Sequence, residues 1–587
     1  MTRRTFAFSL GSIALASLVC RLGYVGWQAV HDPSFARPGL DGAVYLDWAR
    51  ALRSGAGEPS GAFYLAPLFP HLLAALFAIQ GESWRLVYVL QQGMAVGAGC
   101  WLACAAVGRI GETGALFAGS MAMLYQPTAF FASRVVGEPV ALFSVTLGVY
   151  LFTRPSLGSA ALSGLALGFS ALARPNLLLV AGALALMEAG GGRWKRALLL
   201  AAGSAAVLAP VAARNYVASG HVVLVSSNGG ITLYHGNGPG ALGIFTPAVG
   251  FSGTVANQRD EASVLARARS GREMDAVDAD RWWGRQALRT RARDPLGTIV
   301  LLARRLVLTL DAYEHGLDDA PALDANPWRH AFPVRLPVLL GLAAVGVVAL
   351  GFALTGGTAT WIPIAATAVT PVAFYVSSRY RLPMALFLCI PAGAGVAVVL
   401  SAVRTRTGGI SIKALAAGAI LALCSILVPS GSLARAEESQ AHANRASVLA
   451  DARNFPAAEA EARTALALDP TSVSGRYNLA VILTAGGRTG EAETLYREAL
   501  TQDPSHAESA GNLAKLLVER GAAAEAVPIL QRALASRPGD AACWTNLVVA
   551  FLAQGDAARA RQAVRDGERG GVRFAPELLD AVRGGGS

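Results

Sequence analysis

The chain has 587 residues, of which 53% are hydrophobic and only 15% charged, and its mean hydropathy is +0.43. This composition excludes an ordinary soluble protein and indicates a polytopic membrane protein. The formal charge of +11 does not indicate a nucleic-acid partner, because the basic residues form no clustered helix and residues 435–587 carry 17 Lys and Arg against 19 Asp and Glu.

Apolar stretches fill most of the first 430 positions. Eleven of them approach the roughly 20 residues needed to cross a bilayer, centred near residues 18, 95, 122, 146, 164, 181, 206, 344, 369, 392 and 421. The first follows MTRR without a small-residue cleavage pattern, so we expect a retained anchor with a cytoplasmic end. Five of the six cysteines lie in these stretches, which argues against a disulfide framework outside the membrane.

The segment from Tyr64 to Ile79 is short, apolar and contains two prolines, and whether it spans decides the topology of everything after it. If it stays at the interface, the basic residues obey the positive-inside rule. Those residues are Arg109, Arg154, the GGRWKR turn at 191–196, Arg404, Arg406 and Lys413. We therefore expect residues 31–83, 218–332 and the C-terminal part to share the outer, periplasmic side of a bacterial inner membrane.

The first outer loop contains an acid on an amphipathic stretch. Asp41, Tyr45, Trp48 and Leu52 follow one another at spacings of four, three and four, which predicts one stripe of an interfacial helix. The positive end of a helix favours an ionised carboxylate, as a general base requires. Alternatively, Asp41 is only an N-terminal cap.

The tail repeats with a period of 34. The register is carried by recurring small and polar residues at Asn444, Asn478, Asn512 and Asn546, at Ala458, Ala492, Ala526 and Ala560, at Gly487, Gly521 and Gly555, and at Pro470, Pro504 and Pro538. This pattern is typical of tetratricopeptide repeats, whose stacked helix pairs offer a concave surface for a peptide or protein. We expect residues 435–587 to dock a partner protein or to mediate self-association.

Several motifs occur in a fixed order along residues 10–400. They are Asp41 with its Ala-rich helix, YLAPLFP at 64–70, ASRVVGEP at 132–139, ARPN at 173–176, ARNYVASG at 213–220, YHGNGPGALGIF at 234–245 and SSRYRLP at 377–383. Together they resemble the polyprenyl-phosphate-sugar-dependent glycosyltransferases of the C superfamily, in the protein mannosyltransferase and aminoarabinose transferase group called family 39. The implied fold is all-α: a membrane bundle over residues 1–434 followed by the repeat solenoid.

The resemblance implies an inverting transfer of one sugar from a polyprenyl phosphate carrier to a hydroxyl of a protein, glycan or lipid. Asp41 would take the acceptor proton. Many relatives have Asp-Glu where this chain has Asp41-Gly42, so the second carboxylate must come from elsewhere. Glu138 is our candidate and Glu58 the reserve, because an acid near the bilayer is a functional-site hypothesis by default. The ordinary interpretation of Glu138 is that it forms an ion pair with Arg134 at the interface.

The leaving phosphate would need cations. Arg379 and Arg381 at the outer end of a span are the first candidates, with Arg174 and Arg214 behind them, although all could simply snorkel to the interface. Arg21, within the first span, could pair with either acid. Tyr45 and Tyr64 are candidate substrate contacts. No cofactor is certain; Mg²⁺ or Mn²⁺ could bind only through Asp41 and Glu138.

The loop 218–332 contains a glycine-rich piece without the lysine of a phosphate-binding P-loop. We interpret it as a lid over the sugar, with His235 and Asn237 as contacts, or as an ordinary surface loop. Two alternatives stay open for the whole protein. A lipid-linked polysaccharide ligase or polymerase should place its key residues in a late outer loop, and a membrane scaffold or transporter would make the outer acids incidental.

Overall fold

The computed structural model describes residues 3–32, 35, 38, 40–248, 251, 255–316, 324–405 and 411–584. Within these ranges every regular element is a helix, and strand-like pairing is limited to two isolated bridges, Tyr125 with Val334 and Ile244 with Val376. The chain divides into two compact units, Met1–Phe245 with Thr290–Ser430, and Thr246–Arg289 with Gly431–Ser587. The prediction of an all-α fold is confirmed.

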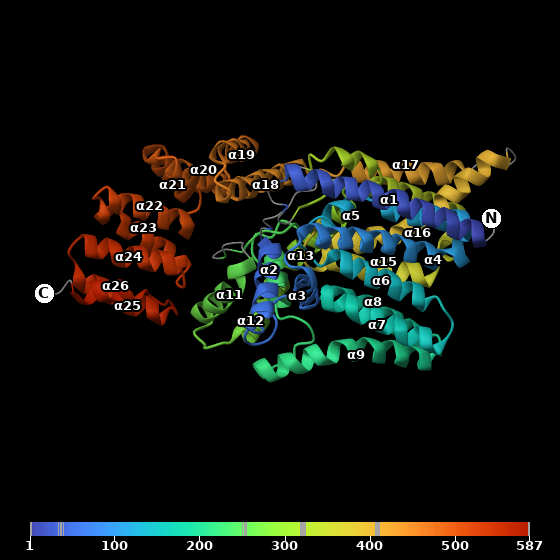
Figure 1. The fold of residues 1–587 in the computed structure, drawn as a ribbon, viewed down its shortest axis with the longest axis horizontal. Helices are drawn as coiled ribbons and strands as arrows, with labels where there is room; N and C mark the ends of the chain where they lie inside the picture. The colour runs from blue at the N-terminus through green and yellow to red at the C-terminus, as the bar shows by residue number, and fades with distance from the viewer. Residues whose placement is uncertain are drawn as a thin grey trace. The chain divides into compact units, whose positions relative to one another are not determined.

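The first unit contains most of the apolar helices (Figure 1). In chain order they are α1 (Arg3–His31), α2 (Leu40–Ser54), α3 (Leu68–Gln80), α4 (Trp84–Leu124), α5 (Gln126–Phe131), α6 (Glu138–Phe152), α7 (Leu157–Ala173), η1 (Pro175–Leu177), α8 (Leu178–Gly190), α9 (Trp194–Ser219), α10 (Gly229–Asn237), α13 (Pro295–Thr309), η3 (Pro327–Ala331), α14 (Leu336–Leu354), α15 (Thr358–Ala373), α16 (Ser378–Thr405) and α17 (Ile412–Ile426).

All eleven predicted span centres fall inside helices, but not all of these helices are long. Five described helices are long and apolar enough to cross a membrane, namely α1, α4, α9, α14 and α16, and a bent pair, Ile412–Ile426 with Gly431–Asp451, makes six if it is one span. α6, α7, α8 and α15 are shorter apolar helices. Two predicted centres share α4. This helix is interrupted at Gly111, whose φ of 68° is a conformation that glycine adopts readily.

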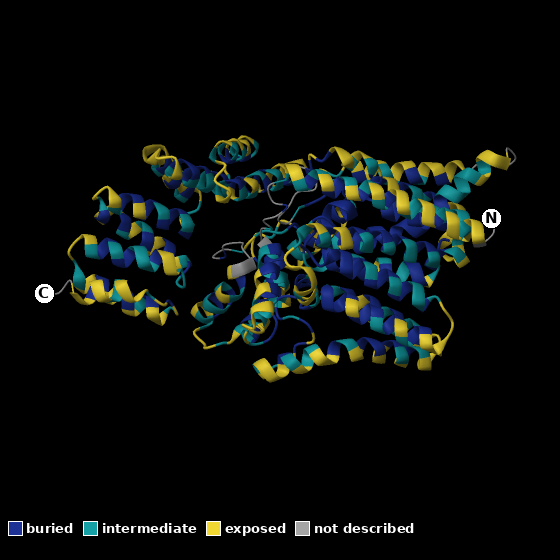
Figure 2. Cartoon of the chain, viewed as in Figure 1, coloured by how far each residue is buried: buried dark blue, intermediate teal, exposed yellow. Residues whose placement is uncertain are grey.

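The bundle is held by close backbone approaches at small residues. A Cβ added to Gly164 of α7 would lie 2.1 Å from the carbonyl oxygen of Leu200 in α9, and one added to Gly395 of α16 would lie 2.1 Å from that of Leu342 in α14. Such contacts let apolar helices pack tightly without a hydrophobic driving force between them. α16, which packs against α4 and α14, is buried along most of residues 378–395 (Figure 2).

The second unit combines part of the long loop with the tail. It contains α11 (Val255–Ser270), most of α12 (Ala276–Arg293), α18 (Gly431–Asp451), α19 (Phe455–Leu468), α20 (Val473–Ala485), α21 (Thr489–Gln502), α22 (Ala507–Glu519), α23 (Ala523–Ser536), α24 (Ala541–Ala553), α25 (Ala557–Arg569) and α26 (Pro576–Gly584). From α18 onward the helices stack as antiparallel pairs (Figure 1).

The 34-residue period explains this stack. The four repeated alanines, one in the second helix of each pair, are fully buried at Ala458, Ala492, Ala526 and Ala560. The repeated glycines end the first helices with φ of 77°, 83° and 75° at Gly487, Gly521 and Gly555, a conformation that side-chain-bearing residues rarely adopt. Asn478 and Asn546 each donate to a carbonyl of the preceding pair, those of Ala443 and Gly511.

Candidate functional site

Four charged side chains from four separate helix ends meet in the first unit. Asp41 lies in the first turn of α2, Glu138 opens α6, Arg174 follows the last residue of α7, and Arg379 is the second residue of α16. Arg174 precedes Pro175, which disfavours helical conformation at Arg174 and ends α7 there. We call these four residues the acid–arginine cluster.

Arg379 joins the two acids of the cluster. Its Nε donates to Glu138 Oε1 at 2.6 Å, and its Nη1 donates to Asp41 Oδ2 at 2.9 Å. Arg174 Nη2 donates to the same Glu138 oxygen. The Glu138, Arg379 and Asp41 side chains are 5%, 8% and 12% exposed, and that of Arg174 is 22% exposed. Two acids therefore balance the charge of two arginines in a largely buried environment. Charge-assisted hydrogen bonds are strong in such an environment and fix the orientation of the side chains.

The acid–arginine cluster borders a small pocket. Its lining combines charged and polar side chains with apolar ones. The lining residues are Glu138, Ala141, Leu142, Arg174, Asn176, Leu177, Arg379, Tyr380, Leu382 and Pro383. Glu138 Oε2 and Arg174 Nε are buried atoms without a hydrogen-bond partner among the described residues. Because buried polar atoms are normally satisfied, two orphans beside a pocket indicate a place for a polar ligand.

Of the two predicted tyrosine contacts, Tyr45 lies beside the acid–arginine cluster. Tyr45, one turn after Asp41, is 2% exposed and packs edge-on against Phe69, with ring centroids 5.5 Å apart. Burial raises the pKa of Tyr45 to about 12, so its phenol stays protonated at neutral pH. Tyr64 is partly buried in the segment before α3. Asn176 of the ARPN motif and Tyr380 line the pocket, and sequence reasoning did not single them out.

Arg381 lies outside the acid–arginine cluster. It is fully buried and donates to the carbonyl oxygens of Asp311 at 2.7 Å and Tyr313 at 2.6 Å, and to Glu314 Oε2 at 2.8 Å. The hydroxyl of Tyr125 donates to the other oxygen of Glu314 at 3.1 Å. These contacts fasten the start of α16 to residues 311–314.

Three other arginines are likewise engaged elsewhere. Arg214 Nη2 donates to the Pro59 carbonyl at 2.6 Å, and its guanidinium lies 3.9 Å from the centre of the Phe63 ring. Arg21 donates to Gln92, Thr128 and the Met123 carbonyl rather than to an acid. Arg134 pairs with Asp32 at 3.1 Å. The reserve acid Glu58 accepts from the Trp48 indole at 3.2 Å and lies 2.7 Å from His71 Nε2.

The predicted lid residues belong to a fixed helix. His235 and Asn237 are both buried at the end of α10. Asn237 donates to the Ala373 carbonyl at 2.9 Å and accepts from Arg305 at 3.1 Å, which ties α10 to α15. His235 packs against Phe245, with ring centroids 5.4 Å apart.

The burial of His235 predicts a pH dependence of stability. Burial lowers the pKa of His235 to about 4 from its usual value near 6.5, so protonation favours the unfolded chain. Its stabilising contribution is complete above pH 6.5 and is lost as the pH falls toward 4. We expect the free energy of unfolding to drop by about 2 kcal/mol from this group between pH 7 and pH 5. Thermal unfolding of the full-length protein in detergent should show a smaller acid-induced loss for His235→Leu; an identical loss would contradict the assignment.

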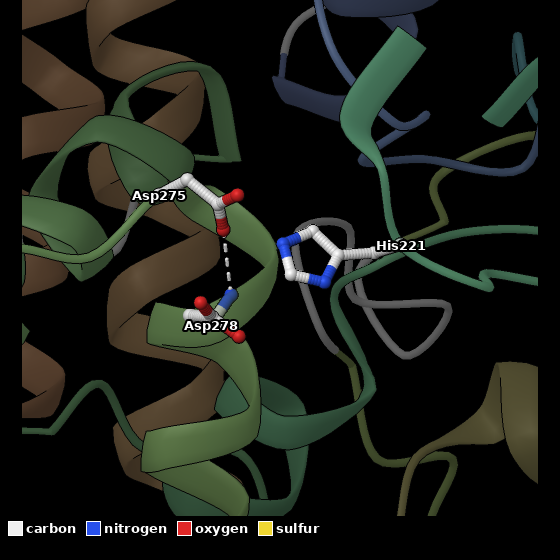
Figure 3. Close-up of side chains that lie close together, drawn as sticks. All are labelled: His221, Asp275 and Asp278. Atoms are coloured by element: carbon white, nitrogen blue, oxygen red, sulfur yellow. Dashed lines mark hydrogen bonds between the residues drawn. The ribbon is translucent and has the colours of Figure 1, made fainter. Parts of the chain in front are cut away.

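The residues of the cluster do not fit a divalent ion in this arrangement. Mg²⁺ needs near-octahedral oxygen ligands, but Asp41 and Glu138 are bridged by the Arg379 cation, and no other carboxylate lines the pocket in the described part of the chain. The metal prediction stays a prediction. Figure 3 labels Asp275 and Asp278, which lie at the start of α12 in the second unit. Asp275 Oδ1 accepts from the backbone N–H of Asp278 at 2.8 Å, which caps the start of α12.

Fold and site together define a class: an α-helical integral membrane protein with a buried acid–arginine cluster and a C-terminal α-solenoid. Residues 444–507 and 517–569 each match a family model described as tetratricopeptide repeat, which confirms that prediction for the tail. No curated protein matches the chain.

Several solved structures are similar to parts of the chain. The oligosaccharyltransferase of Archaeoglobus fulgidus in its apo form is 13% identical with a TM-score of 0.39, covering 74% of this chain and 56% of that one. ArnT from Cupriavidus metallidurans bound to undecaprenyl phosphate is 15% identical with a TM-score of 0.37, covering 88% and 81%. PilF of Pseudomonas aeruginosa is 18% identical with a TM-score of 0.22, covering 32% and 86%.

Proposed function

We propose that the protein is an inverting glycosyltransferase that moves one sugar from a polyprenyl phosphate carrier to an acceptor hydroxyl. The observation that carries the proposal is the acid–arginine cluster, in which Glu138 Oε2 and Arg174 Nε have no hydrogen-bond partner among the described residues and lie beside a partly apolar pocket. A sugar phosphate on an isoprenoid matches this lining, because it presents hydroxyls and an anion at one end and a hydrocarbon chain at the other.

Each charged residue has a role in this proposal. The Asp41 carboxylate accepts the proton of the acceptor hydroxyl while the oxygen attacks the anomeric carbon from the side opposite the phosphate. The bond between that carbon and the phosphate oxygen breaks, and the phosphate leaves with the electron pair. Arg174, whose side chain is the most exposed of the cluster, stabilises the charge that develops on the phosphate.

Glu138 and Arg379 position these groups. Arg379 touches both acids and so fixes the Asp41 carboxylate, which is not part of the pocket lining and is joined to it through Arg379. In the proposal, Glu138 Oε2 accepts a hydrogen bond from a hydroxyl of the sugar, and its lack of another partner among the described residues supports this role. Leu142, Leu177 and Leu382 form the apolar part of the lining, which suits the first isoprene units of the carrier.

The reaction takes place on the outer face of a bacterial inner membrane in this proposal, where the acceptor is an exported protein, a glycan or a lipid. The test is to delete the gene and compare the intact masses of exported proteins, surface glycans and lipids with those of the parent strain. We expect one sugar increment to disappear and to return when the gene is restored. Unchanged masses in all three fractions would refute the proposal.

A further inference from the structure

The loop segment of the second unit has its own small core. Trp283 of α12 is fully buried, and its indole N–H donates to the Ala262 carbonyl of α11 at 2.9 Å. The centres of the Phe251 and Trp283 rings lie 5.4 Å apart. The guanidinium of Arg269, in α11, lies 5.2 Å from the centre of the Trp283 ring. These contacts fold α11 and α12 into one hairpin, which we call the loop hairpin.

The loop hairpin touches the solenoid at one turn. A Cβ added to Gly539, between α23 and α24, would lie 2.9 Å from Val264 Cγ1 and 3.4 Å from Val264 Cβ, so the backbone of the turn rests directly on α11. Two residues earlier, Arg537 is 9% exposed and donates a hydrogen bond to Glu508. The negative charge of Glu261 in α11 also favours the Arg537 cation.

The 34-residue register shows that this turn departs from its equivalents. The two preceding turns begin Asp-Pro followed by a hydroxyl residue, and the hydroxyl donates to that Asp, Thr471 to Asp469 and Ser505 to Asp503, both at 2.6 Å. In the third turn the Asp is replaced by Arg537 and the hydroxyl residue by Gly539. The two positions that break the repeat are therefore those that meet the loop hairpin, one by opposite charge and the other by removal of a side chain.

We propose that the loop hairpin is a built-in docking site for the tetratricopeptide solenoid, recognised by Arg537 and Gly539 of the third turn. The partner of this surface is thus a segment of the same chain. Because the loop hairpin is part of the long loop that connects α10 to α13, docking requires the solenoid to share the compartment of that loop.

An engineered disulfide tests the docking directly. The 3.4 Å between Val264 Cβ and the position of a Cβ on Gly539 is close to the roughly 3.5–4.5 Å found in disulfides. The variant is Val264→Cys with Gly539→Cys, in a Cys543→Ala background that removes the natural thiol nearby. The matched control is Val264→Cys with Ser505→Cys, at the equivalent position one repeat earlier. Full-length protein is oxidised and then cleaved at a protease site placed in the exposed turn at 271–273.

We expect the fragments of the Gly539 pair to stay joined on a non-reducing gel and those of the Ser505 pair to separate. Equal yields from the two pairs, or no linkage in a protein that purifies normally, would overturn the proposal.

A second variant serves in case the cysteine pair does not fold. Gly539→Glu places bulk and a like charge against Val264 and Glu261, and should speed amide hydrogen exchange in α11, whereas Ser505→Glu should not. Unchanged exchange in α11 for Gly539→Glu would also overturn it. Neither readout depends on sugar transfer, so the docking proposal and the proposed function succeed or fail separately.

Discussion

Replacing Arg379 by lysine should leave a folded protein whose sugar transfer is at least roughly a hundredfold slower. Lysine preserves the positive charge between the two acids, which limits the cost to stability. However, a single ammonium on a flexible stem cannot reproduce the fork whose Nε and Nη1 hold Glu138 and Asp41 at 2.6 and 2.9 Å. The Asp41 carboxylate then loses its fixed orientation, and misplaced reacting groups cost large factors in rate.

The measurement is kcat for transfer in detergent, with the thermal unfolding midpoint recorded on the same preparation. Lys195, the second residue of α9, lies outside the motifs that supply the cluster and provides a control as Lys195→Arg, which should keep both values. An Arg379→Lys protein with unimpaired turnover would show that the bridge between the acids has no part in catalysis.

Replacing Arg381 by methionine should instead prevent normal folding. The substitution removes the hydrogen bonds to Asp311, Tyr313 and Glu314 and leaves Glu314 as a buried charge without its cation. Breaking a buried pair in this way costs about 3–5 kcal/mol, a large part of the stability of most domains. We expect a low yield and a lowered unfolding midpoint.

A companion substitution separates the two explanations for Arg381. Adding Glu314→Gln removes the uncompensated charge and should restore part of the midpoint. If Arg381→Met unfolded at the wild-type temperature but lost transfer, Arg381 would be a ligand-binding residue, as its place in the SSRYRLP motif first suggested. Substitutions of the two arginines of this motif are thus expected to have different effects: at Arg379 a loss of activity, and at Arg381 a loss of stability.

Helix geometry explains why the sequence could not separate them. Residues two apart on a helix are rotated by roughly 200° about its axis, so Arg379 and Arg381 at the start of α16 point to opposite sides. Only the packed structure reveals which side holds Asp41 and Glu138 and which holds residues 311–314. The motif alone predicted both as cations near a phosphate.

The alternative interpretation, an ion pair between Glu138 and Arg134, is wrong for a similar reason. A spacing of four brings side chains together only on one continuous helix, but α6 begins at Glu138 and the residues before it are not helical. Arg134 binds Asp32, and Glu138 is free to meet Arg174 and Arg379 from distant parts of the chain. By contrast, the 34-residue period predicted the solenoid well, since each of its repeats depends on local contacts with its neighbours.

The most direct test of the central claim is the transfer activity of Asp41→Asn. Asparagine has nearly the same shape and can still accept a hydrogen bond from Arg379, but it cannot take a proton from the acceptor. Purified wild-type and variant proteins, with matched unfolding midpoints, are given a polyprenyl-phosphate-linked sugar and the acceptor identified from the deletion strain. We expect product formation by the variant to fall by a factor of 100 or more; turnover equal to that of the wild type would contradict the account.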